Sequence, residues 1–165
     1  MEKKIVIING NGGVGKDTFV SFCARHKNVK KCSTVDKIKE AAKVLGWNTA
    51  MKSEVDRKFL ADLKNLSTNY NDFPFTCLKN AIEEFKNDDN EVLFLFIREI
   101  DEIKRMKEYI SCKTLLITNS NTKFIDSNEA DKNVLNYEYD YVVENSLDEE
   151  ELDNKAQEFL KSLFN

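Results

Sequence analysis

The sequence contains few of the residues that build metal centres, disulfide frameworks or turn-rich β folds. Its 165 residues include one proline, five glycines, four cysteines and a single histidine, His26. The cysteines are widely separated and form no C-x-x-C pair, which argues against a zinc site and a disulfide framework. We expect all four to be reduced thiols that pack as small apolar side chains.

The chain also lacks a long apolar run and an excess of positive charge. No segment approaches the length that spans a membrane, and too few apolar residues follow Met1 for a signal-peptide core. Lys and Arg number 25 against 29 Asp and Glu, a net charge of −4, which argues against a broad nucleic-acid surface. We therefore expect a cytoplasmic protein that binds neither membranes nor nucleic acid. Its oligomeric state stays open, a homodimer included.

Four of the five glycines lie within six residues, directly after the apolar run 5–8. Small residues let successive backbone N–H groups turn toward phosphate oxygens. A helix that begins near Lys16 adds the positive end of its dipole, and the Lys16 ammonium suits the β- and γ-phosphates. The segment is therefore predicted to be an ATP-binding P-loop: Gly10, Asn11, Gly12, Gly13, Val14, Gly15, Lys16, Asp17 and Thr18.

Two other interpretations of this loop compete with the P-loop. Gly10-x-Gly12-x-x-Gly15 also fits the dinucleotide-binding fingerprint, and Asp36 lies near the spacing of its ribose-binding acid. A purely structural glycine turn is the other alternative. Lys16 favours the P-loop, because a dinucleotide-binding helix usually continues with small or apolar residues.

The residue after the lysine departs from the usual P-loop, in which a Ser or Thr hydroxyl ligates Mg²⁺. Asp17 holds that position and Thr18 follows it. A carboxylate can bind Mg²⁺ directly or through water, and an acid is also stabilised in the first turn of a helix. Both roles remain open for Asp17 at this stage.

The order of apolar runs and helical patterns predicts an α/β fold. Nearly continuous apolar runs are typical of parallel strands that are covered on both faces. Runs at 5–8, 92–97, 114–118 and 139–143, with a weaker one at 29–32, predict a five-stranded parallel sheet between layers of helices.

Three helices between or after these strands have recognisable starts. Ser53-x-x-Asp56 begins one whose apolar side chains (Val55, Phe59, Leu63 and Leu66) share a face that we expect to be core. A second begins at Asp72-Phe73-Pro74. Ser146-x-x-Glu149 is a predicted capping box for the last helix, whose inner face carries Leu152, Ala156, Phe159 and Leu163.

The chain is most simply one domain, residues 1–165. Residues 48–88 form a predicted helical insertion, and the polar connection 119–136 is either a flap over the phosphates or a solvated loop. In a parallel sheet ligands bind beyond the carboxyl ends of the strands. The P-loop, Arg98 and Asn119 are therefore expected at one edge.

Other sequence features indicate which kind of phosphate chemistry the P-loop serves. It has no D-x-x-G or N-K-x-D of Ras-type GTPases, and the run 92–97 continues as Arg98-Glu99 instead of the acid of motor ATPases. An arginine there suits a second anionic substrate or the charge of a transferring phosphoryl group. This pattern favours a kinase that acts on a small phosphorylated acceptor.

With Gly15-Lys16-Asp17-Thr18, the sequence resembles the deoxynucleoside monophosphate kinases of phages and bacteria. Phosphomevalonate kinases of animals share the Gly-Lys-Asp feature. The similarity continues through residues 33–42, 45–47, 56–60, 97–99 and 140–145, although Lys37 stands where relatives tend to have proline. It implies a three-layer P-loop NTPase fold with a helical substrate-binding insertion, ATP and Mg²⁺ as co-substrates, and a (deoxy)nucleoside monophosphate as acceptor.

The resemblance also implies roles for individual residues. Lys16, Asp17 and Arg98 would be catalytic, and Asp17 and Thr18 would hold Mg²⁺. The predicted acceptor-binding residues are Asp36, Lys39, Arg57, Arg98 and Lys123. The base and sugar of the acceptor stay open.

Two alternatives to this activity remain. One is an ATP-binding regulatory protein with little turnover, supported by the missing acid after the central strand and by a flap with lysines but no arginine. The other is a kinase of another small phosphorylated metabolite.

Overall fold

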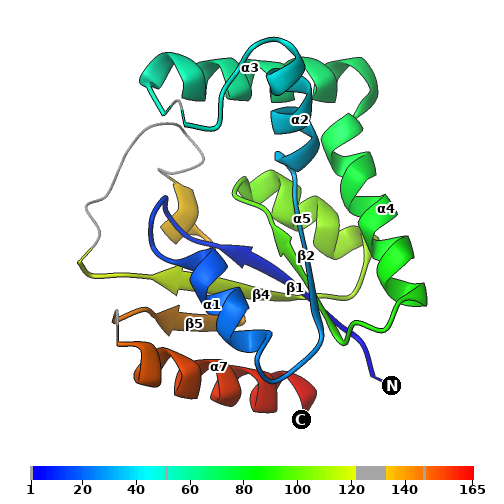
Figure 1. Cartoon of the computed structure of the whole chain (residues 1–165). Helices are drawn as coiled ribbons and strands as arrows, with labels where there is room; N and C mark the ends of the chain where they lie inside the picture. Colours follow the sequence, from blue (N-terminus) through cyan, green and yellow to red (C-terminus); the bar gives the residue numbers. More distant parts are fainter. Residues whose placement is uncertain (1, 51, 122–132, 147) are drawn as a thin grey trace. The chain divides into compact units, whose positions relative to one another are not determined.

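A computed structural model describes residues 2–50, 52–121, 133–146 and 148–165 (Figure 1). The chain divides into two compact units, which we describe separately. The first contains residues 1–31 and 88–165, and the second contains residues 32–87.

The first unit is built on the predicted sheet. The strands of the sheet are β1 (Lys4–Asn9), β2 (Val29–Ser33), β3 (Val92–Phe96), β4 (Lys113–Thr118) and β5 (Tyr141–Glu144), in the order β2-β3-β1-β4-β5. The last two residues of β2 fall in the second unit. The central strand β1 pairs in parallel with β3 and with β4, so Val6 lies opposite both Phe94 and Lys113. The described residues thus confirm the predicted five-stranded parallel sheet.

Helices cover both faces of this sheet. The helices α1 (Lys16–Cys23) and α7 (Glu149–Phe164) share one apolar core with the strands, in which the rings of Phe19 and Phe159 lie 5.7 Å apart. Figure 1 shows α5 (Ile100–Tyr109) behind the sheet, where Ile103 and Met106 are buried. Burial on both faces explains why β1, β3 and β4 are nearly continuously apolar. The predicted three-layer α/β fold is confirmed.

The cap of α7 differs from the prediction. Its N-cap is Asp148, whose side chain accepts a hydrogen bond from the Glu151 backbone N–H at 3.0 Å. The predicted capping box of Ser146 and Glu149 is wrong, because Asp148 is itself a strong capping residue directly before the helix. The predicted inner face is correct, since Leu152, Ala156, Phe159 and Leu163 are all buried.

The second unit contains the helices α2 (Asp36–Val44), α3 (Glu54–Asn71) and α4 (Phe73–Asn87). The predicted start of α3 is confirmed by a capping box: Ser53 Oγ accepts from the Asp56 N–H at 3.2 Å, and the Asp56 carboxylate accepts from the Ser53 N–H at 3.0 Å. The α4 stripe of Phe75, Leu78, Ile82 and Phe85 is buried.

Only part of the predicted apolar face of α3 is packed, because Phe59 and Leu63 are half-buried but Val55 and Leu66 are not. Val55 is 77% exposed and Leu66 is 68% exposed, whereas Lys64 on another side of the helix is buried. The hydrophobic period of a helix shows which residues share a face, but it does not show which face the neighbouring helices cover.

Two further predictions concern the connection 119–136 and the membrane. Residues 122–132 of the predicted flap, with Lys123, lie outside the described residues. A short 3₁₀ helix, η1 (Val134–Asn136), precedes β5. None of the described helices combines the length and the apolar character needed to cross a bilayer.

Candidate phosphate-binding site

The P-loop connects β1 to α1 and depends on glycine conformations. Gly10, Gly13 and Gly15 have φ angles of 153°, 80° and 94°, which other residues rarely adopt. Gly15 is the N-cap of α1, so the helix begins at Lys16 as predicted. The backbone N–H groups of the first turn and the positive end of the helix dipole are therefore at the loop, as an anion site requires.

Close packing also limits the loop to glycine at its first position. A Cβ atom on Gly10 would lie 2.5 Å from the Ile117 carbonyl oxygen and 2.8 Å from Val14 Cγ2. At Gly12 the same addition would meet no atom within 4 Å. The two glycines thus serve different purposes: close approach to β4 at Gly10, and open space at Gly12.

Asn145 holds the loop from the end of β5. Its side chain is 4% exposed and donates a hydrogen bond to the Val14 carbonyl at 3.0 Å. Its backbone N–H donates to the Thr118 carbonyl at 2.7 Å. The side chain also fills the space beside Gly15, where a Cβ would collide with Nδ2. Asn145 therefore ties the P-loop to the ends of β4 and β5.

Asn9, the last residue of β1, supports the start of the loop. This fully buried amide accepts from the Gly10 N–H at 2.8 Å and donates to the Arg98 carbonyl at 3.1 Å and the Tyr139 hydroxyl at 2.9 Å. The hydroxyl in turn donates to the Val134 carbonyl at 2.8 Å. Burial raises the pKa of Tyr139 to about 12, so the phenol stays protonated and can donate.

Lys16 lies over the loop that it follows. Its ammonium donates to the Gly10 carbonyl at 2.5 Å and the Asn11 carbonyl at 3.1 Å. These contacts keep the positive charge at the mouth of the P-loop, where phosphate oxygens would bind.

Asp17 and Thr18 are both exposed in the first turn of α1. The Asp17 carboxylate is 74% exposed and pairs with the Lys31 ammonium at 2.6 Å through Oδ1. Mg²⁺ in phosphate sites commonly takes only one or two protein oxygens, and the remaining ligands are phosphate and water. The two adjacent oxygen donors fit such an ion, although Lys31 competes for the carboxylate. Among the described residues, no three His, Cys, Asp or Glu side chains gather as a metal site.

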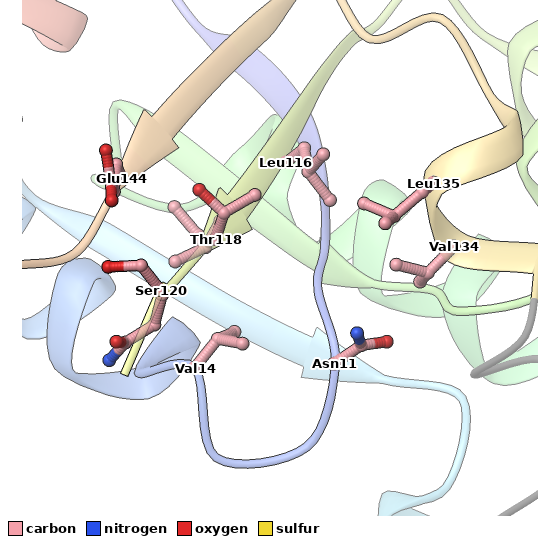
Figure 2. A pocket seen from close by; sticks show the side chains of 10 residues that line it. Asn11, Val14, Leu116, Thr118, Ser120, Val134, Leu135 and Glu144 are labelled. Atoms are coloured by element: carbon pink, nitrogen blue, oxygen red, sulfur yellow. The ribbon is translucent and has the colours of Figure 1, made fainter. Parts of the chain in front are cut away.

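A pocket of about 390 Å³ lies beside the loop (Figure 2). Figure 2 shows Asn11 and Val14 of the loop at one side, Val134 and Leu135 of η1 at another, and Thr118 at the end of β4. Apolar walls with a few hydroxyl and amide groups are typical of small-molecule sites, and the volume lies in their range.

The predicted site residues fall into three groups. The P-loop residues and Arg98 belong to the first unit, and the Asn9 hydrogen bond ties the Arg98 backbone to the base of the loop. Asp36, Lys39 and Arg57 belong to the second unit and are exposed; Asp36 and Lys39 lie one turn apart on α2. Lys123 lies outside the described residues.

Sequence reasoning missed Asn9, Tyr139 and Asn145 as parts of the site. The available signal was a polar asparagine directly at the end of a buried apolar run, at Asn9 after Ile8, whereas Asn145 follows the exposed Glu144 and carries no such signal. Such a residue gains little by burial unless it makes hydrogen bonds, so its position indicates a structural role.

The fold is shared with solved structures. TT1252 from Thermus thermophilus is 19% identical to this chain, with a TM-score of 0.57 over 99% of each chain. Shikimate kinases from Bacteroides thetaiotaomicron and Aquifex aeolicus are 14% and 12% identical, both with TM-scores of 0.48. They cover 96% and 95% of this chain, and the matches span 98% and 96% of their own chains. No protein-family model matches this sequence, and no curated protein matches it.

The similarity to TT1252 shows the fold. Together with the loop after β1, this fold defines the chain as an α/β protein of the P-loop class.

Proposed function

We propose that the chain is an ATP-dependent kinase that transfers the γ-phosphoryl group to a (deoxy)nucleoside monophosphate. The observation that carries the proposal is the P-loop itself, with three glycines in special conformations and Lys16 at the start of α1. Phosphoryl transfer depends mainly on positioning and charge neutralisation, and this loop supplies both for a polyphosphate.

The pocket beside the loop suits the nucleoside of the same nucleotide. Asn11 and Val14 belong to the P-loop and also line the pocket. Phosphates at the loop and a base in the pocket can therefore belong to one molecule. The apolar side chains of Val134 and Leu135 would contact the base. The dinucleotide interpretation is less favoured, because Lys16 places a cation where phosphates of a triphosphate would lie.

The other residues take the roles that the sequence resemblance implies. Asp17 and Thr18 would hold Mg²⁺, which in such sites neutralises phosphate charge. Arg98 would contact the transferred phosphoryl group, and Asp36, Lys39, Arg57 and Lys123 would bind the acceptor. The sequence similarity to deoxynucleoside monophosphate kinases is the basis for this acceptor class.

One observation favours a second candidate, an ATP-binding regulatory protein with little turnover. Asp17 is engaged by Lys31 in a 2.6 Å ion pair, which reduces its availability for a metal. In that case ATP would bind and raise stability, but no acceptor would be phosphorylated.

A screen of ADP release across the common nucleoside and deoxynucleoside monophosphates tests the proposal, with direct detection of the diphosphate product. We expect acceptor-dependent ADP release with at least one monophosphate, and a loss of about 10²–10³-fold in kcat for Lys16→Ala. Lys161→Ala, an exposed change on α7, is the matched control. ATP binding without transfer to any acceptor would favour the regulatory candidate, and an unchanged Lys16→Ala would contradict the donor site.

Other small phosphorylated metabolites, including coenzyme A precursors, belong in the same screen. Phosphoryl transfer to one of these metabolites but to no nucleotide would support a kinase activity and contradict a nucleoside monophosphate as the acceptor.

A further inference from the structure

Asn145 contacts the peptide group that links the P-loop to α1. Its buried side chain donates a hydrogen bond from Nδ2 to the Val14 carbonyl at 3.0 Å. The same nitrogen lies against the α-carbon of Gly15, because a Cβ atom added there would collide with it. Asn145 therefore touches both residues of the peptide group between Val14 and Gly15 through one amide nitrogen.

The geometry of this peptide group determines where the Gly15 N–H points. A trans peptide is planar, and its C=O and N–H bonds point in opposite directions. None of the described peptide bonds is cis. Because the Val14 carbonyl points to the Asn145 amide, the Gly15 N–H points away from it. Within the described residues no backbone carbonyl accepts a hydrogen bond from this N–H, so it can donate to a ligand.

We propose that Asn145 is a positioning residue for phosphate binding. By holding the Val14 carbonyl, it turns the N–H of Gly15, the N-cap of α1, toward the phosphate oxygens, beside the N–H groups of the first helical turn. Asn145 acts through this peptide group and does not itself contact phosphate. The proposal rests on the proposed function, because it takes the loop to bind the polyphosphate of a nucleotide.

Asn145 also links the loop to the pocket shown in Figure 2. Its backbone N–H donates to the Thr118 carbonyl at 2.7 Å, and it directly follows Glu144 in the chain. Val14, Thr118 and Glu144 all line the pocket. A nucleotide with its base in the pocket and its phosphates at the loop needs the two at a fixed separation. We therefore expect ATP to lose at least as much affinity as inorganic tripolyphosphate when Asn145 is changed.

Two substitutions of nearly constant side-chain size separate this role from a general contribution to stability. Asn145→Leu removes the hydrogen bond to Val14 and adds no charge near the phosphates. Thr114→Val is the matched control. Thr114 is fully buried, and its hydroxyl donates to the Asp140 carboxylate and accepts from the Asp140 N–H, both at 2.9 Å. These bonds tie the start of β4 to the residue before β5, at the opposite end of the two strands from the loop.

Isothermal titration calorimetry with tripolyphosphate and with ATP, both in the presence of Mg²⁺, tests the proposal. We expect Asn145→Leu to raise the Kd of both probes about 10–100-fold, because a hydrogen bond to a charged phosphate is lost or misdirected. We expect Thr114→Val to lower the Tm by about 2–4 °C and to leave both Kd values within about twofold. Circular dichroism checks that the variants are folded, and Asn145→Ala takes the place of Asn145→Leu if the latter does not fold.

The outcomes distinguish this proposal from the proposed function. Unchanged Kd values for Asn145→Leu would overturn the positioning role and leave the ATP site intact. Weaker ATP binding with unchanged tripolyphosphate binding would also overturn it, because Asn145 would then act on the pocket wall alone. An equal loss of affinity in Thr114→Val would do the same, since the effect would follow stability. A wild-type chain that binds neither probe would overturn the donor site and this proposal with it.

Discussion

Gly10 and Gly12 are two positions apart in the P-loop, but their surroundings differ. Gly10 has a φ of 153° and no room for a Cβ, because the Ile117 carbonyl would lie 2.5 Å from it. We expect Gly10→Ala to lower the free energy of unfolding by about 2–4 kcal/mol, since backbone atoms of β4 must move. Urea denaturation followed by circular dichroism measures this change.

Gly12→Ala is the matched control. Its Cβ would meet no atom within 4 Å, and its φ is not positive. We expect a change in unfolding free energy within about 0.5 kcal/mol, because the added methyl group meets no neighbour. Equal destabilisation by both substitutions would show that the loop does not pack against β4 as described.

Lys31 offers a second test at the scale of one residue. It pairs with Asp17, and both side chains are largely exposed. If Asp17 holds Mg²⁺ in the proposed kinase, Lys31→Met removes a competing cation and should lower the Mg²⁺ concentration for half-maximal activity about two- to fivefold, a small effect because exposed ion pairs are weak. A Mg²⁺ titration at saturating ATP measures this, and an unchanged value would argue that Asp17 does not ligate the metal.

The sequence predicted the glycines and the lysine of the loop but not the residues that support the loop. The glycines and the lysine are recognisable in the sequence because they lie within one short segment at a fixed spacing. Asn9 forms hydrogen bonds with Arg98 and Tyr139, which are 89 and 130 positions away. Asn145 forms one with Val14, which is 131 positions away. Pairs that far apart become neighbours only through the strand order of the sheet.

At the scale of elements, Asp88 joins the amino-terminal ends of β1, β2 and β3. It accepts from the Asn90 N–H at 2.9 Å and pairs with Lys30 at 3.3 Å and Lys3 at 3.5 Å. Burial alone would raise its pKa, but the hydrogen bonds from Asn90 and Lys30 lower it from 3.8 to about 2. A carboxyl whose pKa is lowered by folding stabilises the folded state above its unfolded pKa.

We therefore expect wild type to be more stable than Asp88→Asn from pH 5 to pH 7. This advantage should shrink as the pH falls below 3.8 and be mostly lost near pH 2, where the unfolded state is protonated and the folded state is about half protonated. Urea denaturation midpoints at several pH values measure this difference in stability. The control is Asp89→Asn, the same change at the exposed neighbouring carboxylate. A constant difference at all pH values would contradict the ionic role of Asp88.

Strands and helices differed in how well the sequence predicted them. The central strands β1, β3 and β4 are mostly buried, so their apolar runs located them to within about two residues. Apolar periodicity on α3 showed which side chains share a face, but the prediction that this face is core was wrong for Val55 and Leu66, which are exposed. Burial depends on which elements pack nearby, and the period of apolar residues along one helix does not show this.

At the scale of the whole molecule, β2 joins the two compact units. The boundary between Lys31 and Cys32 lies inside this strand, which spans Val29–Ser33. Unfolding of the second unit would therefore also disturb an edge of the sheet. For this reason we expect both units to unfold in a single transition.

The single tryptophan makes this testable, because Trp47 belongs to the second unit and the P-loop belongs to the first. ATP with Mg²⁺ at 100 times its Kd should stabilise the folded state by about 2.7 kcal/mol. For a chain of this length that corresponds to a rise of about 5–10 °C in Tm. We expect Trp47 fluorescence and far-UV circular dichroism to report the same rise, and Lys16→Ala to show little of it. A fluorescence transition that ATP leaves unchanged, while the circular dichroism transition shifts, would show that the units unfold independently.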